Sequence, residues 1–320
     1  MNDNLFQVTK DGKSGFINDK GQIVIDLTFD GVSSFSEGLA RIFVDDKVGF
    51  IDKQGNIQVE PKFDTVSGFS EGMAYATIGD KYGYIDKSGN FIIEPMFYRC
   101  WAFENGYALV MQEVVSTGCF IDNFGTIKLN GRNFLVSKYS EGLINCSERG
   151  DWGHIDINGN FIIPPNYKYT REFSEGKAAI APKKINGKAN RKDLYAFINK
   201  GNEIIIPPLF TGADIHFSEG MCAVFDSGYG YINAKGQLII PCDLCLGQHF
   251  SEGLAVIKED AKIKKYGYID KTGTIAIKPT FTLAESFKNG LASVTIGKKY
   301  EEFKHGYIDK SGNYIWEPTR

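Results

Sequence analysis

Long apolar runs are missing from this chain of 320 residues. No stretch approaches the roughly 18 apolar residues that a membrane-spanning helix needs. The first residues, "MNDNLFQVTKDGKSGF", also lack the basic segment followed by an apolar segment that marks a secretory signal. We therefore expect a soluble protein without a signal peptide.

An excess of charge of either sign is missing too. The 36 Lys and Arg residues nearly balance the 39 Asp and Glu residues, and the formal net charge is -3 at pH 7. This balance provides no general attraction to nucleic acids or anionic membranes, although it is compatible with a local basic patch. The composition therefore disfavours nucleic-acid binding by the whole chain.

Histidine is scarce, with His154, His216, His249 and His305 as the full set. No Ser/His/Asp or Cys/His arrangement typical of nucleophilic catalysis stands out. The glycines lie between predicted strands rather than between a strand and a helix, which argues against a phosphate-binding loop. We expect no enzymatic activity and no cofactor, and a carboxylate pair assembled in three dimensions stays open.

What the chain does contain is an internal repeat. An aromatic-x-x-Gly element, most often "FSEG", starts at Phe35, Phe69, Phe103, Tyr139, Phe173, Phe217, Phe250 and Phe287. Between these copies lies a ring residue followed by Ile and Asp or Asn, with the invariant isoleucine at Ile17, Ile51, Ile85, Ile121, Ile155, Ile198, Ile232, Ile269 and Ile308. Self-similarity at such a period indicates a tandem-repeat fold.

Each repeat predicts a three-stranded antiparallel meander. A β-branched run such as "LARIFV" (39–44) is strand one, "GYID" (83–86) is strand two, and "FIIEP" (91–95) is strand three after a glycine turn. Because proline cannot donate to a ladder, we expect strand three to end at its proline. These prolines are Pro61, Pro95, Pro165, Pro208 and Pro279. The connector that follows is predicted to be irregular or a short fourth strand.

A small residue near the start of strand one predicts how the repeats meet. Its positions are Ala40, Ala74, Ala108, Ile144, Ala178, Cys222, Ala255 and Ala292, small in all but one case. Small side chains allow close approach of a neighbouring repeat. The connector aromatics would fill the interface between the two repeats, which we call the seam. A lone meander is only marginally stable, so we expect one stacked repeat domain over 1–320. Its approximate repeats are 5–38, 39–72, 73–106, 107–142, 143–176, 177–220, 221–253, 254–290 and 291–320.

The pattern "FSEGLA…YGYIDKSGN.IIEP" resembles the WG-repeat family, a bacterial family of short β repeats, over essentially residues 5–320. The literal dipeptide occurs once, as Trp152-Gly153, and other copies read Val48-Gly49, Tyr82-Gly83, Tyr229-Gly230 and Tyr266-Gly267. The resemblance implies a β-repeat scaffold. The family usually has no catalytic assignment, and it has no agreed function that could be transferred to this chain.

The fold class is therefore predicted to be all-β, a tandem array of about nine three-stranded antiparallel meanders. The chain starts and ends with a full meander, so neither end supplies a fragment that completes the other, and nine blades would be many for a propeller. We favour an open curved β-solenoid or superhelix, with a closed propeller-like ring as the alternative.

The most regular polar feature is the glutamate of "FSEG". It lies at Glu37, Glu71, Glu141, Glu175, Glu219 and Glu252, and Asn105 and Asn289 replace it in two copies. A row of carboxylates could bind cations or basic peptides. Since Asn and Glu both accept hydrogen bonds from backbone N–H groups in a turn, we favour a structural capping role.

Six cysteines fall in different slots of the repeat, which predicts no disulfide framework and fits a reducing, cytoplasmic location. The exception is "PCDLCLGQHFSEG", where Cys242, Cys245 and His249 have metal-like spacing. His216 occupies the slot of His249 one repeat earlier. Zinc binding by these four residues, or thiol chemistry of the cysteine pair, is an alternative to ordinary half-buried thiols.

Three repeats lengthen the turn between strands one and two, at 181–195, 257–266 and 296–305. Insertions at one slot often mark a binding edge. Their basic residues are Lys183, Lys184, Lys188, Arg191, Lys192, Lys262, Lys264, Lys265, Lys298 and Lys299. They could attract an acidic protein or an anionic polymer, or could simply form solvated, disordered tips that protect strand edges.

We therefore predict a non-catalytic repeat scaffold for macromolecular recognition, chiefly of protein. The alternatives are a zinc-binding or thiol-active protein centred on Cys242, Cys245 and His249, and binding of an anionic polymer through the basic loops. No membrane insertion is expected. The identity of the partner and the oligomeric state are beyond what the local pattern determines.

Overall fold

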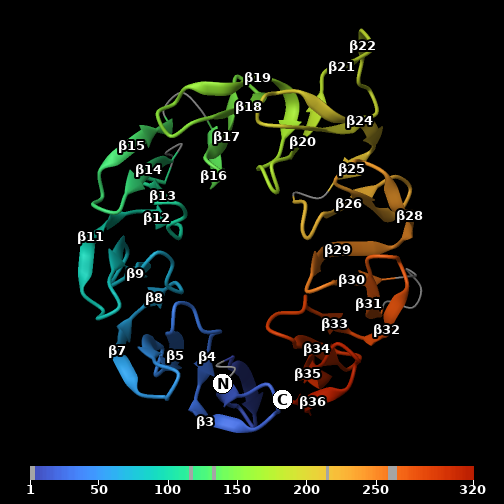
Figure 1. The fold of residues 1–320 in the computed structure, drawn as a ribbon. Coiled ribbons are helices and arrows are strands. Elements are labelled where there is room, and N and C mark those ends of the chain that lie inside the picture. The colour runs from blue at the N-terminus through green and yellow to red at the C-terminus, as the bar shows by residue number, and fades with distance from the viewer. Residues whose placement is uncertain (1–3, 115–117, 132–134, 214–215, 259–264) are drawn as a thin grey trace. The chain divides into compact units, whose positions relative to one another are not determined.

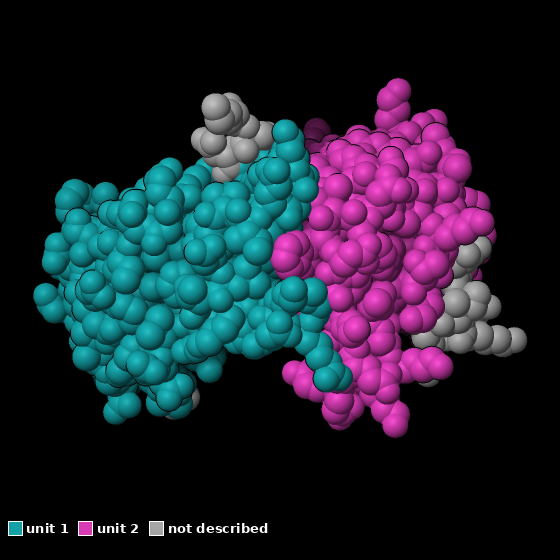
Figure 2. All heavy atoms as spheres, turned by 90° about the horizontal axis from the view of Figure 1, so that it is seen from below, with its two compact units in different colours: residues 1–142, 157–159, 319–320 teal, residues 143–156, 160–318 magenta. Residues whose placement is uncertain are grey.

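The computed structural model describes residues 4–114, 118–131, 135–213, 216–258 and 265–320 (Figure 1). Their regular structure consists of β-strands and short 3-10 turns such as η2 (Tyr300–Glu302). Within these residues, no helix combines the length and apolar character needed to cross a membrane. The chain divides into two compact units, which Figure 2 colours separately: unit 1 contains residues 1–142, 157–159 and 319–320, and unit 2 contains 143–156 and 160–318.

Unit 1 repeats one small antiparallel sheet. Its described strands form a three-stranded sheet and three four-stranded sheets, each in consecutive order. They are β1 (Phe6–Lys10), β2 (Lys13–Ile17), β3 (Ile23–Phe29); β4 (Gly31–Val32), β5 (Ala40–Val44), β6 (Lys47–Ile51), β7 (Ile57–Phe63); β8 (Thr65–Val66), β9 (Ala74–Thr77), β10 (Tyr82–Ile85), β11 (Phe91–Phe97); and β12 (Arg99–Cys100), β13 (Tyr107–Met111), β14 (Cys119–Asp122), β15 (Ile127–Asn130). β16 (Leu135–Ser140) is the last strand of this unit.

Unit 2 continues the same pattern. β17 (Leu143–Glu148), β18 (Asp151–Ile155), β19 (Phe161–Thr170), β20 (Ala178–Pro182), β23 (Tyr195–Ile198) and β24 (Ile204–Phe210) follow one another in one sheet. A separate hairpin is β21 (Lys184–Ile185) with β22 (Lys188–Ala189). The four-stranded sheets are β25 (Gly212–Ala213), β26 (Met221–Phe225), β27 (Tyr229–Asn233), β28 (Leu238–Leu244); β29 (Leu246–Ser251), β30 (Leu254–Lys258), β31 (Tyr266–Asp270), β32 (Ile275–Phe281); and β33 (Leu283–Ala284), β34 (Ala292–Ile296), β35 (Lys304–Ile308), β36 (Tyr314–Thr319).

The predicted all-β tandem array of meanders is confirmed. Each of the nine predicted central strands is present, as β2, β6, β10, β14, β18, β23, β27, β31 and β35. The connector is resolved as a short fourth strand, since β8 pairs antiparallel with β9 and places Val66 opposite Ala76. The choice between an open array and a closed ring stays a prediction.

The expectation that proline ends strand three is wrong. β7 runs on to Phe63 through Pro61, and β11 runs on to Phe97 through Pro95. Each of these strands is the last in its sheet, so its outer side needs no ladder donor there, and the pairing with strand two is irregular at that point. The proline therefore sits inside an edge strand, where it discourages pairing with another chain.

The seam between repeats is the core, as predicted. The invariant isoleucines are all at most 1% exposed. The residues at the position near the start of strand one that is usually small, which we call the small slot, are also at most 1% exposed. The ring before the isoleucine packs on the "FSEG" ring of the sheet that follows, for example Phe50 on Phe69 with centroids 4.8 Å apart. In unit 2 Tyr231 meets Phe250 in the same way at 5.0 Å. A buried cluster accordingly joins residues of neighbouring sheets, such as Val59 and Ala74.

The glycine in strand two lies directly against the backbone of strand three. A Cβ on Gly83 would lie 2.4 Å from the carbonyl oxygen of Ile93 and 2.8 Å from the nitrogen of Pro95. The same distance of 2.4 Å separates a Cβ on Gly153 from the Ile163 carbonyl oxygen. The "WG" glycine thus marks where strand three bulges over strand two.

Candidate binding site

The longest insertion, residues 181–195 between β20 and β23, folds into a small hairpin. Its strands β21 and β22 pair antiparallel. The turn is Asn186-Gly187, whose φ angles of 49° and 76° fit the two-residue type I′ loop that Asn-Gly favours. In Figure 1 the hairpin extends away from the sheet that contains β20, β23 and β24. The structure therefore describes this insertion as a regular hairpin.

Buried Asn190 fixes the base of the hairpin. Its Nδ2 donates to the carbonyl oxygens of Pro182 and Leu194, both at 3.0 Å, and its Oδ1 accepts from the N–H of Leu194 at 2.9 Å. Lys168 adds bonds from Nζ to the Asn190 carbonyl at 2.7 Å and to the Asp193 carboxylate at 2.6 Å. The tip is therefore held at a defined place on unit 2.

Within the described residues, some of the predicted basic side chains form ion pairs or hydrogen bonds, and the others, which we call open, form no ion pair. Lys183 pairs with Asp151 at 2.6 Å, and the Nζ of Lys265 donates to the Thr282 hydroxyl at 3.0 Å. Among the predicted basic residues that the structure describes, those that are exposed and form no ion pair are Lys184, Lys188, Arg191, Lys192, Lys298 and Lys299. Lys262 and Lys264 lie outside the described residues. A role of these loops in partner binding stays a prediction.

The predicted zinc ligands are not brought together. Cys242 lies half-buried in β28, Cys245 is exposed, His249 is exposed in β29, and His216 is half-buried. Across the described ranges, no three His, Cys, Asp or Glu side chains gather closely enough to hold a metal ion. Burial raises the pKa of the Cys242 thiol, which lowers its thiolate fraction and its nucleophilic reactivity.

The other cysteines belong to the core. Cys100, Cys119, Cys146 and Cys222 are buried. Burial raises the pKa of Cys100 and of Cys146 to about 12. Such thiols pack as small apolar side chains and are chemically inert.

Five "FSEG" glutamates cap turns, as predicted, but they cap the turn of the next repeat rather than their own. Oε2 of Glu219 accepts from the N–H of Gly253 at 3.0 Å, and Nζ of Lys271 lies 3.1 Å from the same oxygen. In unit 1, Oε2 of Glu71 accepts from the N–H of Gly106 at 2.7 Å. The carboxylates are therefore occupied in holding neighbouring repeats together.

Replacing Glu219 by glutamine is expected to lower the free energy of unfolding by about 1 kcal/mol, because a charged acceptor of two backbone N–H groups becomes neutral. Burial would raise the pKa of Glu219, but hydrogen bonds from Lys271, Gly253 and Glu252 lower it below its usual value. The loss should therefore be full at neutral pH and shrink as the pH falls and the wild-type carboxylate becomes protonated. Urea unfolding of the wild type and of the Glu219→Gln variant measures this loss of stability, with exposed Glu301→Gln as the control. Equal stability of the Glu219 and Glu301 variants would contradict the capping role.

A backbone position in four connectors is held by a side chain of the strand two that precedes it. The Tyr84 hydroxyl donates to the carbonyl of Trp101 at 2.8 Å, and that of Tyr268 to the carbonyl of Glu285 at 2.8 Å. The Tyr231 hydroxyl donates to Gln248, and the His154 Nε2 bonds to the carbonyl of Arg171 at 2.8 Å. The sequence separation is 17 residues in each of these four cases.

In two repeats where the ring is phenylalanine, a serine hydroxyl bonds at this position instead. Ser33, 17 residues after Phe16, accepts at its Oγ from the N–H of Arg41 at 3.1 Å. Ser67, equally far after Phe50, accepts from Tyr75 at 3.1 Å. The backbone at this position is thus anchored in either version of the repeat.

The residue whose backbone is anchored in this way and the residue after it directly precede the buried ring of "FSEG". We call these two residues the presented pair. In the described residues the complete pairs are Ser33-Ser34, Ser67-Gly68, Trp101-Ala102, Ser137-Lys138, Arg171-Glu172, Gln248-His249 and Glu285-Ser286. Trp101 is 41% exposed, and Arg171, His249 and Glu285 are exposed too. The repeat therefore keeps this backbone fixed and changes the side chains it carries to the surface.

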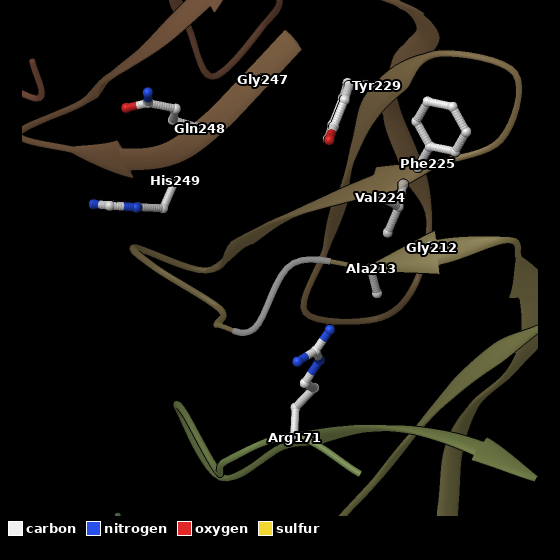
Figure 3. Close-up of a pocket in the computed structure, with 9 residues that line it drawn as sticks. All are labelled: Arg171, Gly212, Ala213, Val224, Phe225, Tyr229, Gly247, Gln248 and His249. Carbon is white, nitrogen blue, oxygen red and sulfur yellow. The ribbon is translucent and has the colours of Figure 1, made fainter. Parts of the chain in front are cut away.

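Two presented pairs contribute to a pocket of about 530 Å³ in unit 2. Its lining is Arg171, Gly212, Ala213, Val224, Phe225, Tyr229, Gly247, Gln248 and His249. In Figure 3 the Arg171 side chain rises from the end of β19 toward Ala213, and the Tyr229 hydroxyl points down the view, toward the side where Ala213 and Arg171 lie. The side chains of Gln248 and His249 extend away from Phe225.

Sequence reasoning found one of these residues for another reason and missed the central one. His249 was predicted as a zinc ligand and instead lines the pocket, while Arg171 was not singled out. The available signal was the pair of residues before each "FSEG" ring, which varies from repeat to repeat while its surroundings do not.

The comparison with protein families gives one result that covers most of the chain. The model described as the WG containing repeat matches residues 15–47, 49–82, 82–113, 152–188, 195–228, 229–262 and 266–300. No curated protein matches the chain.

Solved structures resemble the chain in fold. A crystal structure of the eukaryotic initiation factor matches with a TM-score of 0.66 at 9% identity, covering 99% of this chain and 96% of that chain. Weaker likenesses are AztD from Citrobacter koseri (TM-score 0.45, 11% identity, 99% and 93% covered) and BamB from Moraxella catarrhalis (0.44, 14%, 81% and 89%). At such identities the likeness concerns the fold alone.

Proposed function

Because the chain belongs to the family of proteins with the WG containing repeat, a β-repeat scaffold, we propose that it is a non-catalytic scaffold that binds another protein. The observation that carries this proposal is the presented pair. A fixed backbone with variable exposed side chains is how repeat proteins build recognition surfaces on a common core. We further propose that residues 1–320 act as one repeat domain.

The chemistry of the presented pairs favours a protein partner. The pairs place an aromatic, a basic and an acidic side chain on the surface as Trp101, Arg171 and Glu285. Tryptophan and arginine are enriched among residues that dominate protein interfaces. Stacking of nucleobases would instead call for several exposed rings interleaved with basic residues. The free cysteines support a reducing, cytoplasmic location as part of this proposal.

The basic hairpin supplies a second contact in this proposal. Its open residues Lys184, Lys188, Arg191 and Lys192 form a local positive charge on a chain of formal net charge -3. An acidic protein surface would complement it and would associate faster at low salt.

The test is affinity capture from an extract of cells that naturally make the protein. One variant carries Trp101→Ser, Arg171→Ser and Glu285→Ser, since serine is the residue that other repeats carry at this position. A matched control carries Ile57→Ser, Ile92→Ser and Leu238→Ser, all about half exposed in wild type at 48%, 51% and 50%. We expect a protein partner that the wild type and the control retain and the first variant loses at least tenfold.

A further arm reverses the charge of the four open hairpin residues to glutamate. Salt-sensitive loss of the same protein would add the hairpin to the interface, whereas unchanged capture would remove it. Equal recovery by all variants would overturn the presented pairs as the contact surface. Capture that disappears after nuclease treatment would mean that nucleic acid rather than protein is bound, and would overturn the proposal.

A further inference from the structure

Resting on the proposed function, we infer that the pocket of unit 2 binds a carboxylate of the partner, with Arg171 as its ligand and an apolar residue beside it. The pocket belongs to consecutive repeats of one unit, because its walls come from the end of β19 and from β25, β26, β27 and β29. Its volume of about 530 Å³ lies in the range of about 300 to 1,000 Å³ that small-ligand sites occupy.

Arg171 is fixed at its backbone and open at its side chain. Its N–H donates to the Ala179 carbonyl at 2.9 Å, and its own carbonyl accepts from the Nε2 of His154 at 2.8 Å. The guanidinium forms no hydrogen bond or ion pair with any residue in the described part of the chain, and its side chain points toward the pocket (Figure 3). A positioned but unpaired guanidinium offers a planar fork of donors that matches a carboxylate.

The rest of the lining is more apolar than charged. Val224 is 1% exposed and Phe225 is 39% exposed, and the Phe225 ring meets the Tyr229 ring edge-on with centroids 5.2 Å apart. Tyr229 also brings a hydroxyl, and Gln248 brings an amide. These walls suit an apolar side chain adjoining the charged group.

Two glycines keep the pocket open. A Cβ on Gly212 would lie 3.1 Å from the Cβ of Phe225, and one on Gly247 would lie 2.6 Å from the Tyr231 hydroxyl oxygen. The Tyr231 hydroxyl is already used, because it donates to the Gln248 carbonyl. The two strands therefore pass close to their neighbours without side chains that would fill the space.

The charge of the lining favours a carboxylate over a phosphate. Arg171 is the one arginine or lysine among the lining residues, and Glu172 follows it in the chain. A phosphate group carries close to two negative charges and is usually bound by a cluster of basic residues. A carboxylate carries one charge and pairs with one guanidinium. Its two protein sources are a chain terminus and an acidic side chain.

The test is fluorescence polarisation with the full chain and three labelled hexapeptides of one length. The first ends in Phe-Leu with a free carboxylate, the second is its C-terminal amide, and the third has an internal Glu beside Phe and an amidated end. We expect the first or third peptide to bind at least tenfold more tightly than the amide, and which of the two binds identifies the source of the carboxylate.

Variants assign the effect to Arg171. We expect Arg171→Gln to weaken the preferred peptide at least tenfold and Arg171→Lys to weaken it less, because lysine keeps the charge and loses the fork. Exposed Arg149→Gln in the same unit should leave binding unchanged. Unfolding midpoints equal to wild type are expected for each variant, because the exposed Arg171 side chain forms no hydrogen bond or ion pair in the described part of the chain.

Three results would overturn the carboxylate site: equal binding of all three peptides, no binding of either acidic peptide, or unchanged binding by Arg171→Gln. A phosphoserine peptide that binds more tightly than both acidic peptides would also overturn it. The scaffold proposal would survive each of these if the triple presented-pair variant still loses the captured protein. The failure of the site and the failure of the scaffold are therefore distinguishable.

Discussion

Replacing Gly83 by valine is expected to lower the free energy of unfolding by about 3 kcal/mol or more, because strand three leaves no room for a branched side chain. The three nearest atoms to a Cβ at this position are backbone atoms of Ile93, Pro95 and Glu94, at 2.4, 2.8 and 2.9 Å. Backbone atoms can give way only if the bulge and the core beneath it shift. Urea unfolding monitored by circular dichroism gives the change.

Alanine at Gly83 should cost less than valine, since one repeat already carries an alanine there. Ala196 occupies the slot in β23 with the same shift of register, between the pairs Tyr195 with Phe210 and Phe197 with Ile206. A control is Gly72→Ala, where φ is +80° and no atom lies within 4 Å, so that backbone strain of about 1 kcal/mol is the expected cost. A valine at position 83 that costs no more than this control would contradict the close approach.

The sequence was enough to predict the strands and the seam, because both follow from a short period. The invariant isoleucine lies two residues after the glycine of strand two, and this alternation places it on the buried face in every copy. The small slot of strand one is buried for a related reason, since it faces the neighbouring sheet. A pattern repeated nine times leaves little choice of register.

Proline and glutamate were harder to place, because their roles depend on what lies beside them. Proline ends a strand only where its missing N–H is needed, and at the edge of a sheet Pro61 continues β7. The capping role of Glu219 was predictable from its chemistry. Its partner in the next repeat was not, because no local pattern gives the rotation between repeats.

The pocket shows the same limit more strongly. Arg171 and His249 are far apart in the chain and come together through the packing of successive sheets in unit 2. Spacing within one segment suggested a metal site around His249, because Cys242 and Cys245 are near it in sequence. The structure places Cys242 in β28 and His249 in β29, and no three potential metal ligands of the described residues gather there. Local spacing thus assigned His249 the wrong neighbours.

The largest pH effect is expected at His154, which occupies the slot where other repeats have Tyr or Phe. It is 1% exposed, and its Nδ1 has no hydrogen-bond partner among the described residues. Burial lowers the pKa of His154 to about 4, although its bond to the Arg171 carbonyl acts in the opposite direction. An unfolded chain would protonate this histidine near pH 6.5. The folded state is therefore at full stability above that pH and loses stability as the pH falls toward 4.

His154→Tyr should remove this loss, because a phenol does not titrate in that window. Its hydroxyl can donate to the Arg171 carbonyl, as Tyr84, Tyr231 and Tyr268 do in their own repeats. The gain in unfolding free energy over wild type should increase by about 2.5 kcal/mol between pH 7.5 and pH 4.5. His154→Phe should show the same pH dependence and be about 1 kcal/mol less stable than the tyrosine variant at both pH values, because the carbonyl loses its donor. Urea unfolding of the three proteins at both pH values decides it, and parallel pH profiles for wild type and His154→Tyr would show that the buried imidazole does not control the acid stability.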